Sequence, residues 1–116
     1  MEMIVHLHPE VFELVREGTK DVEVRVYDEK RRQLKVGDTL LFLKRPDDKE
    51  KIRVEVTNIA LYSDFREVTY AYPMERIYMK DTTQDDYLAL MSQFYKPEEV
   101  LENGVVALEF QILSEE

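Results

Sequence analysis

The sequence predicts an α+β domain in which helices pack on the outside of a small, mostly antiparallel β-barrel. Strand-like segments occur at both ends of the chain, with helical segments between them. A strongly apolar segment near the C-terminus must pair with earlier strands, and a closed barrel allows this without leaving hydrophobic edges. The 116 residues, of which 44% are hydrophobic, suffice for one core, so we expect a single domain over residues 1–116.

The first half of the chain is dominated by strands with apolar residues at alternating or consecutive positions. They lie at residues 3–7, 22–26, 39–43 and 52–59, the last continuing towards Tyr62. One helix is predicted between the first two strands, over residues 9–17. Pro9 occupies its first turn and Gly18 ends it.

The second half carries the remaining helices. Asp64 with Glu67 and Thr83 with Asp86 have the spacing of helix N-terminal caps. The first of these helices ends at Pro73 and the second near Phe94, while residues 75–81 fit either a helix or a loop. One more turn begins at Pro97 and stops at Asn103-Gly104, and a strong final strand follows over 105–113.

Charge is distributed unevenly along the chain. The net charge is −9, but residues 1–60 hold 12 Lys and Arg against 13 Asp and Glu, whereas residues 61–116 hold 4 against 12. A nonspecific nucleic-acid binder presents a broad basic face, which this chain lacks. A small nucleotide-derived ligand or a short single-stranded RNA segment suits this distribution better.

Several other classes of function are disfavoured. The chain has no cysteine, so it forms neither disulfides nor thiolate metal sites. His6 and His8 have no further ligands at metal-binding spacing, and we expect neither a metal nor another cofactor. No apolar run is long enough for a membrane span, and the N-terminus lacks the features of a secretion signal. By default we expect a cytoplasmic location and no membrane partner. The oligomeric state stays open.

The most distinctive polar residues surround the strand over 22–26. Val22, Val24 and Val26 alternate with Glu23 and Arg25, so the strand has one apolar and one charged face, and Lys20 precedes it. One interpretation is a surface ion-pair ladder of small energetic value. The other is the floor of a binding site, in which Arg25 binds a phosphate or a carbonyl and Lys20 and Glu23 act in acid–base roles.

Further candidates follow this strand. Lys30 and Arg31 belong to the densest basic run and could contact phosphate, while Asp28 is expected to hold the loop. Most of the aromatic residues are expected to pack in the core. Tyr62 and Phe65 are the candidates for stacking on a base, because they follow the long strand where it leaves the barrel.

The ordered motifs Gly18-Thr19-Lys20, Glu23-Val24-Arg25, Asp28-Glu29-Lys30-Arg31 and Val36-Gly37-Asp38 resemble the ASCH domain (activating-signal-cointegrator homology), a branch of the PUA-like superfamily. The resemblance covers residues 3–68 and the final strand. It implies a PUA-like β-barrel with a cleft beside the strand that carries Glu23 and Arg25. It also implies RNA or a nucleotide-derived ligand as the substrate class.

Some members of that family resemble amidohydrolases that deacetylate modified cytidine with a lysine and a threonine nucleophile three residues later. Lys20 matches the lysine, but Glu23 stands at the threonine position and cannot make the same hydroxyl attack. Three hypotheses therefore stay open. The chain is a binding module for RNA or a modified nucleoside, a small hydrolase of such a ligand, or a domain whose acidic half, residues 61–116, binds a basic protein.

Overall fold

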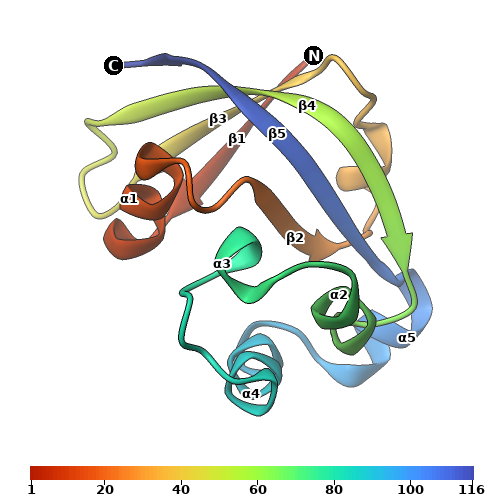
Figure 1. The fold of residues 1–116 in the computed structure, drawn as a ribbon. Coiled ribbons are helices and arrows are strands. Elements are labelled where there is room, and N and C mark those ends of the chain that lie inside the picture. The colour runs from red at the N-terminus through yellow and green to blue at the C-terminus, as the bar shows by residue number, and fades with distance from the viewer.

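A five-stranded sheet organises the computed structural model, which covers residues 1–116 (Figure 1). Its strands are β1 (Glu2–Leu7), β2 (Val22–Val26), β3 (Thr39–Lys44), β4 (Lys51–Tyr62) and β5 (Val105–Glu115). Their order in the sheet is β1-β3-β4-β5-β2. Only the β1–β3 pair is parallel, so the sheet is mostly antiparallel as predicted.

The last strand lies inside the sheet rather than at its edge. β5 pairs with β4 along its length and with β2 over Val105–Glu109, which confirms that the final strand pairs with early ones. β1 and β2 form the two edges and do not pair with each other, so the curved sheet is a half-barrel and not the closed barrel that the sequence predicted. Two bulges in the β4–β5 ladder, near Arg53 and between Val56 and Asn58, accompany this curvature.

Helices pack around the half-barrel, which confirms the predicted α+β class. They are α1 (Pro9–Glu17), α2 (Phe65–Ala71), α3 (Met74–Ile77), α4 (Gln84–Phe94) and α5 (Pro97–Asn103), with a 3₁₀ turn at Arg31–Gln33. In Figure 1, α2 to α5 gather at the end of the sheet away from both termini. None of these helices combines the length and apolar character that a membrane crossing requires.

The predicted caps form. The side chain of Asp64 accepts a hydrogen bond from the backbone N–H of Glu67 at 2.9 Å, and Thr83 accepts one from Asp86 at 3.1 Å. The segment over residues 75–81, which the sequence left ambiguous, begins inside the short helix α3 and continues as a loop.

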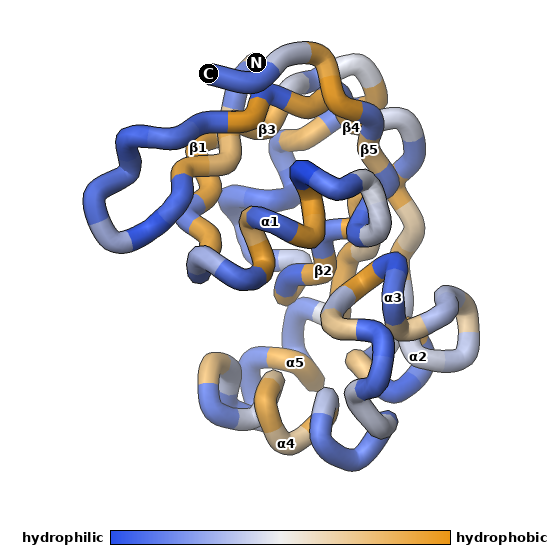
Figure 2. The backbone as a smooth tube through the Cα atoms, turned by 60° about the vertical axis from the view of Figure 1, so that its left-hand side comes forward, coloured by the Kyte–Doolittle hydropathy of each residue, from blue (hydrophilic) through white to orange (hydrophobic).

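Two clusters of buried side chains make up the core. The first fills the half-barrel, where Phe12 and Val15 of α1 pack, fully buried, against Phe42 and Phe110 of the sheet. The second lies between β2, β5 and the helices, and includes Val22, Val24 and Val26 as the alternation predicted. In Figure 2 the strands carry most of the hydrophobic colour and the β3–β4 hairpin loop is hydrophilic. Because the valines of β2 belong to this second cluster, the helices cover β2.

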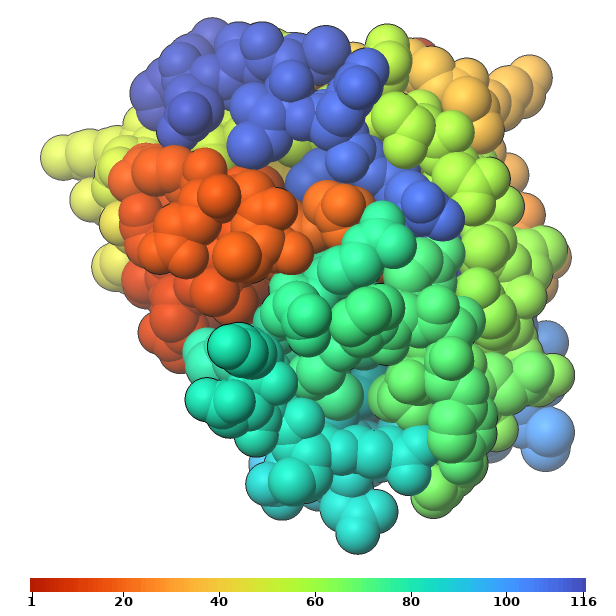
Figure 3. Space-filling model, in the orientation of Figure 1, coloured from red at the N-terminus to blue at the C-terminus, as the bar shows by residue number.

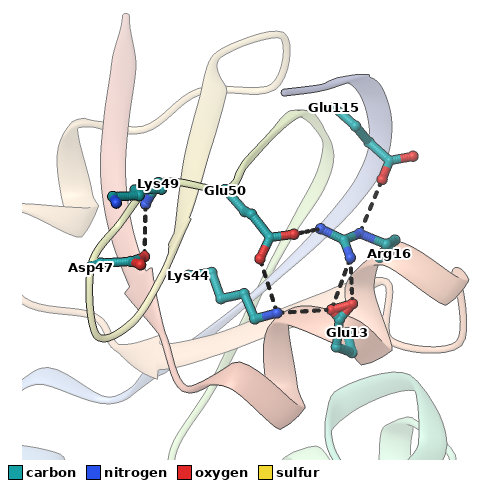
Figure 4. Close-up of polar contacts among 7 residues, drawn as sticks. All are labelled: Glu13, Arg16, Lys44, Asp47, Lys49, Glu50 and Glu115. Atoms are coloured by element: carbon teal, nitrogen blue, oxygen red, sulfur yellow. Dashed lines mark hydrogen bonds and ion pairs between the residues drawn. The ribbon is translucent and has the colours of Figure 1, made fainter.

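An ion-pair network ties α1 to the half-barrel (Figure 4). The guanidinium of Arg16 contacts Glu13 at 2.6 Å, Glu50 at 2.5 Å and Glu115 at 3.3 Å, and Lys44 bridges Glu13 and Glu50. These side chains come from α1, β3, the hairpin after it and the end of β5. The network fixes the position of α1, and with it the start of the segment that leads into β2.

Candidate functional site

The turn after α1 delivers Lys20 to the start of β2. Gly18 adopts the left-handed conformation (φ 85°) and its N–H donates to the carbonyl of Val15, which ends the helix. The N–H of Lys20 then donates to the carbonyl of Leu14 at 3.1 Å. The chain enters β2 directly, so Lys20, Glu23 and Arg25 converge.

Lys20 is 3% exposed, and its ammonium group is fully engaged. Its Nζ donates to the carbonyls of Val22 at 2.5 Å and Ile77 at 2.9 Å, and it lies 3.2 Å from Oε1 of Glu23. Three acceptors match the three N–H bonds of a protonated amine. Burial lowers the pKa of Lys20, and the Glu23 carboxylate opposes that change. Lys20 therefore holds β2, α3 and Glu23 together and has no donor left over.

Glu23 lies between two cations. It is 5% exposed, with Oε1 facing Lys20 and Oε2 accepting from Nε of Arg25 at 2.7 Å. Burial alone raises the pKa of Glu23, but the charges of Lys20 and Arg25 outweigh burial and hold the pKa below its ordinary value. The carboxylate is thus ionised at neutral pH and already accepts from both neighbours.

Arg25 is the member of the trio that reaches solvent. Its side chain is 24% exposed, and its only ion pair is the one from Nε to Glu23. The charge of Glu23 raises the pKa of Arg25, and the nearby Tyr95 hydroxyl acts in the same direction. The two terminal nitrogens have no ionic partner in the protein. With one carboxylate between two cations, the trio keeps a net positive charge at the exposed guanidinium.

The basic loop after β2 is partly held by the protein itself. Asp28 accepts from the backbone N–H of Arg31 at 3.1 Å and from its guanidinium at 3.2 Å, in the loop-holding role predicted for it. Arg32 lies over the Tyr27 ring at 4.5 Å. Lys30 is exposed and forms no ion pair, so of the two predicted phosphate contacts it is the freer cation.

The aromatic candidates lie within the second core cluster or against it. Phe65 is 5% exposed and its ring stacks on Tyr95, with centroids 5.5 Å apart and 23° between the planes. Tyr62 is half-buried and packs edge-on against Tyr72. Stacking of a base on Phe65 therefore requires Tyr95 to move, whereas Tyr62 keeps part of its surface accessible.

Tyr87 of α4 and Tyr95, which directly follows that helix, were not among the predicted site residues but act on the charges of the trio. The Tyr95 hydroxyl adds to the effect of Glu23 in raising the pKa of Arg25, and burial together with the charge of Glu23 raises the pKa of Tyr87. Their spacing along the helix indicated only packing, and nothing in the sequence linked α4 to β2. The sequence did contain one chemical indication, since a tyrosine that is buried in a core usually needs a hydrogen-bond partner for its hydroxyl group.

Two hollows lie on the helical half of the molecule. One, of about 590 Å³, borders Tyr78 and the loop before α4. The other, of about 570 Å³, borders Phe65, Tyr95 and Leu101. The Lys20–Glu23–Arg25 trio lines neither of them. In Figure 3, α1 (red) and the segment from α2 to α4 (green to cyan) lie against each other, and little of the orange segment that includes β2 is in view on this face.

The chain matches the family model of the ASCH domain over residues 5–114. A search of curated proteins finds no match.

Two solved structures resemble the whole chain. The crystal structure of hypothetical protein PH0355 has a TM-score of 0.85 and 33% identity, covering 97% of this chain and 100% of that one. The solution structure of protein PF0455 from Pyrococcus furiosus has a TM-score of 0.79 and 33% identity, covering 98% and 99%. The ASCH protein of Zymomonas mobilis shares the fold at 13% identity, with a TM-score of 0.64, covering 95% of this chain and 66% of that one.

Proposed function

Because the chain belongs to the ASCH domain family, we propose that it binds RNA or a modified nucleoside or nucleotide through Arg25. The family has a PUA-like fold and is generally thought to bind RNA. The observation that carries the proposal is the state of the Arg25 guanidinium. Its Nε is fixed by Glu23 while its terminal nitrogens lack an ionic partner. A guanidinium held in this way suits a phosphate or a base carbonyl.

The loop that follows β2 offers further cations for an anionic or strongly polar ligand. Lys30 is exposed and unpaired on the loop that follows β2, and Arg31 lies in the next position. The acidic second half of the chain repels a long phosphate backbone, so we propose a mononucleotide-sized ligand or a short single-stranded segment. Tyr62 is the aromatic residue with accessible surface for a base.

In this proposal Lys20 and Glu23 are positioning residues. The hydrolase alternative requires them to move protons during a reaction. Lys20 already donates to two carbonyls and lies against Glu23, and Glu23 accepts from Arg25 with a pKa below its ordinary value. These contacts favour binding over catalysis, because each proton-transfer role would first require one of them to break.

The proposal is tested by isothermal titration calorimetry, which measures the affinity of the protein for short RNAs and for the four ribonucleoside monophosphates. Arg25→Ala is expected to weaken binding at least tenfold, as the loss of a charged hydrogen bond of about 1.5–3 kcal/mol implies. Arg53→Ala is the matched control, since its Nε also donates to a glutamate, Glu2, at 2.6 Å. Along β5, the partner of Arg53 is eight residues from that of Arg25, roughly 26 Å of strand. Equal affinity in wild type and Arg25→Ala would refute the proposal.

A second candidate function, docking of a basic protein segment, has one observation in its favour. Leu101 of α5 is 88% exposed and borders the apolar hollow that Phe65 and Tyr95 also line. Glu98 and Glu102 lie on the same helix, so the surface suits an apolar anchor flanked by cations. We expect the protein to bind a lysine-rich amphipathic peptide with an affinity that falls as salt rises. Leu101→Asp should abolish this binding, and Arg25→Ala should leave it intact. Binding unchanged in Leu101→Asp would exclude this surface.

A further inference from the structure

The outer edge of β1 carries unpaired backbone groups. The carbonyl of Leu7 accepts from the N–H of Arg45 at 2.9 Å, and that of Met1 accepts from the first residue of β3 at 3.0 Å. Backbone groups alternate in direction along a strand, so the odd-numbered residues of β1 face β3. The even-numbered residues, which direct their N–H and C=O groups away from β3, are Glu2, Ile4 and His6. No bond of a turn, loop or cap involves these groups, and β1 has no second neighbour in the sheet.

The opposite edge of the sheet, at β2, is protected by contrast. Nζ of Lys20 donates there to the carbonyl of Val22, and the N–H of Asp21 donates to the carbonyl of Arg76 in α3 at 3.1 Å. An inward-pointing charge and a covering helix are two of the ways in which proteins keep an edge strand from pairing with another chain. The open groups of β1 receive no such contact.

The same edge presents an apolar side chain. Ile4, at the middle of β1, is 52% exposed on the outer face of the sheet, whereas Met3 and Val5 on either side of it are buried in the core. Leu41 of β3 lies opposite Ile4 and is half-buried. Ile4 and Leu41 thus form a short apolar strip that runs up to the open edge. Unpaired backbone groups beside an exposed apolar side chain favour pairing with a further strand.

We propose that β1 pairs antiparallel with β1 of a second copy of this chain, so that two half-barrels share one continuous sheet. A two-fold axis beside Ile4 sets Ile4 of one copy opposite Ile4 of the other, and the two apolar strips meet there. In this register the open groups of all three even-numbered residues form hydrogen-bonded pairs.

Charge favours the same register. Glu2 of one copy lies opposite His6 of the other, so no like charges face each other across the axis. A shift by two residues would place either Glu2 or His6 opposite a position beyond the end of the partner strand, because β1 spans Glu2–Leu7. A shift by one residue would set open groups against groups already paired with β3.

Sedimentation velocity over a range of concentrations tests the pairing. One pair of strands buries less surface than a typical stable interface, so we expect a reversible dimer that forms as the protein approaches about 1 mM. Ile4→Lys puts two like charges opposite each other and should lower the association constant at least tenfold. Phe94→Lys is the control, since Phe94 is 56% exposed on α4, and should leave it unchanged. A wild type that stays monomeric, or an equal effect of both variants, overturns the proposal.

Disulfide cross-linking tests the register, because the chain has no cysteine of its own. With oxidised glutathione at a concentration where wild type associates, Ile4→Cys should form a covalent dimer, since Cα atoms in a hydrogen-bonded pair are about 5.5 Å apart. Glu2→Cys and His6→Cys should cross-link only when mixed, because the two copies of either position are four residues apart, roughly 13 Å. Failure of Ile4→Cys to cross-link, or dimers of Glu2→Cys alone as abundant as those in the mixture, would overturn the proposed pairing.

Discussion

The charge of Glu23 can be removed without changing the shape of the side chain. Glu23→Gln leaves the ammonium of Lys20 and the guanidinium of Arg25 next to each other with no carboxylate between them. The side chains of Glu23 and Lys20 are 6% and 4% exposed, so the cost is that of breaking a buried pair, about 3–5 kcal/mol. We expect the free energy of unfolding to fall by that amount.

Such a loss is large for a domain of this length. Stability of 0.05–0.15 kcal/mol per residue gives a total of roughly 6–17 kcal/mol for 116 residues. With an unfolding entropy of about 2.1 cal/mol/K per residue, the same loss lowers the melting temperature by about 12–20 °C. Urea titration and thermal unfolding, both followed by circular dichroism, measure these two quantities independently.

A matched pair on the surface provides the control. Glu2→Gln breaks the Glu2–Arg53 pair, whose Nε–Oε1 distance is 2.6 Å but whose side chains are 37% and 33% exposed. Because the pair is solvated, this variant should lower the free energy of unfolding by at most about 1 kcal/mol. Adding Lys20→Met to Glu23→Gln should recover part of the loss, because it removes one unpaired cation. Equal losses in Glu23→Gln and Glu2→Gln, or no recovery in the double variant, would refute the reasoning.

Three further predictions concern pH, salt and backbone strain. The pKa of Glu23 is lower in the folded than in the unfolded protein, so the Glu23 carboxylate stabilises the folded state above pH 4.5 and this stabilisation is lost as pH falls through the folded-state pKa. In an acid titration, the free energy of unfolding should therefore fall less steeply in Glu23→Gln than in wild type. Arg16→Ala removes the centre of the network in Figure 4, and its destabilisation should shrink markedly at 1 M NaCl; a salt-independent loss would mean that packing of Arg16 over Phe12 matters more. Gly104→Ala should lower the free energy of unfolding, measured by urea titration, by about 2 kcal/mol or more, because Gly104 has a φ of 71° and an added Cβ would lie 3.0 Å from a backbone oxygen. Gly18→Ala, with open space around its Cβ, should lower it by about 1 kcal/mol.

Local chemistry made the secondary structure predictable. As expected, α1 begins at Pro9 and ends before Gly18, and Asp64 and Thr83 cap their helices through their side chains. The sheet order was less accessible, since nothing in the sequence indicated that β1 and β3 run parallel. Between these two strands the chain passes through α1, β2 and the 3₁₀ turn before β3 begins beside the start of β1, so the pairing depends on tertiary packing.

The same limit applies to the site. Alternation along β2 predicted that Glu23 and Arg25 share a face, and the structure brings Lys20 to them. The near-complete burial of Lys20 and Glu23 was not predictable, because alternation says which residues share a face and not what covers that face. The cover includes α3, whose Ile77 carbonyl accepts from Lys20 across 57 positions of sequence.

The interior position of β5 bears on how the polypeptide acquires its native state. Residues 105–115 leave the ribosome after every other strand, yet they join β2 to β4. A nascent chain that lacks them holds β2 apart from the remaining three strands, with unpaired hydrogen-bonding edges on both sides. Completion of the sheet therefore waits for its last strand and is of high contact order, and the unfinished intermediate is the species most exposed to aggregation.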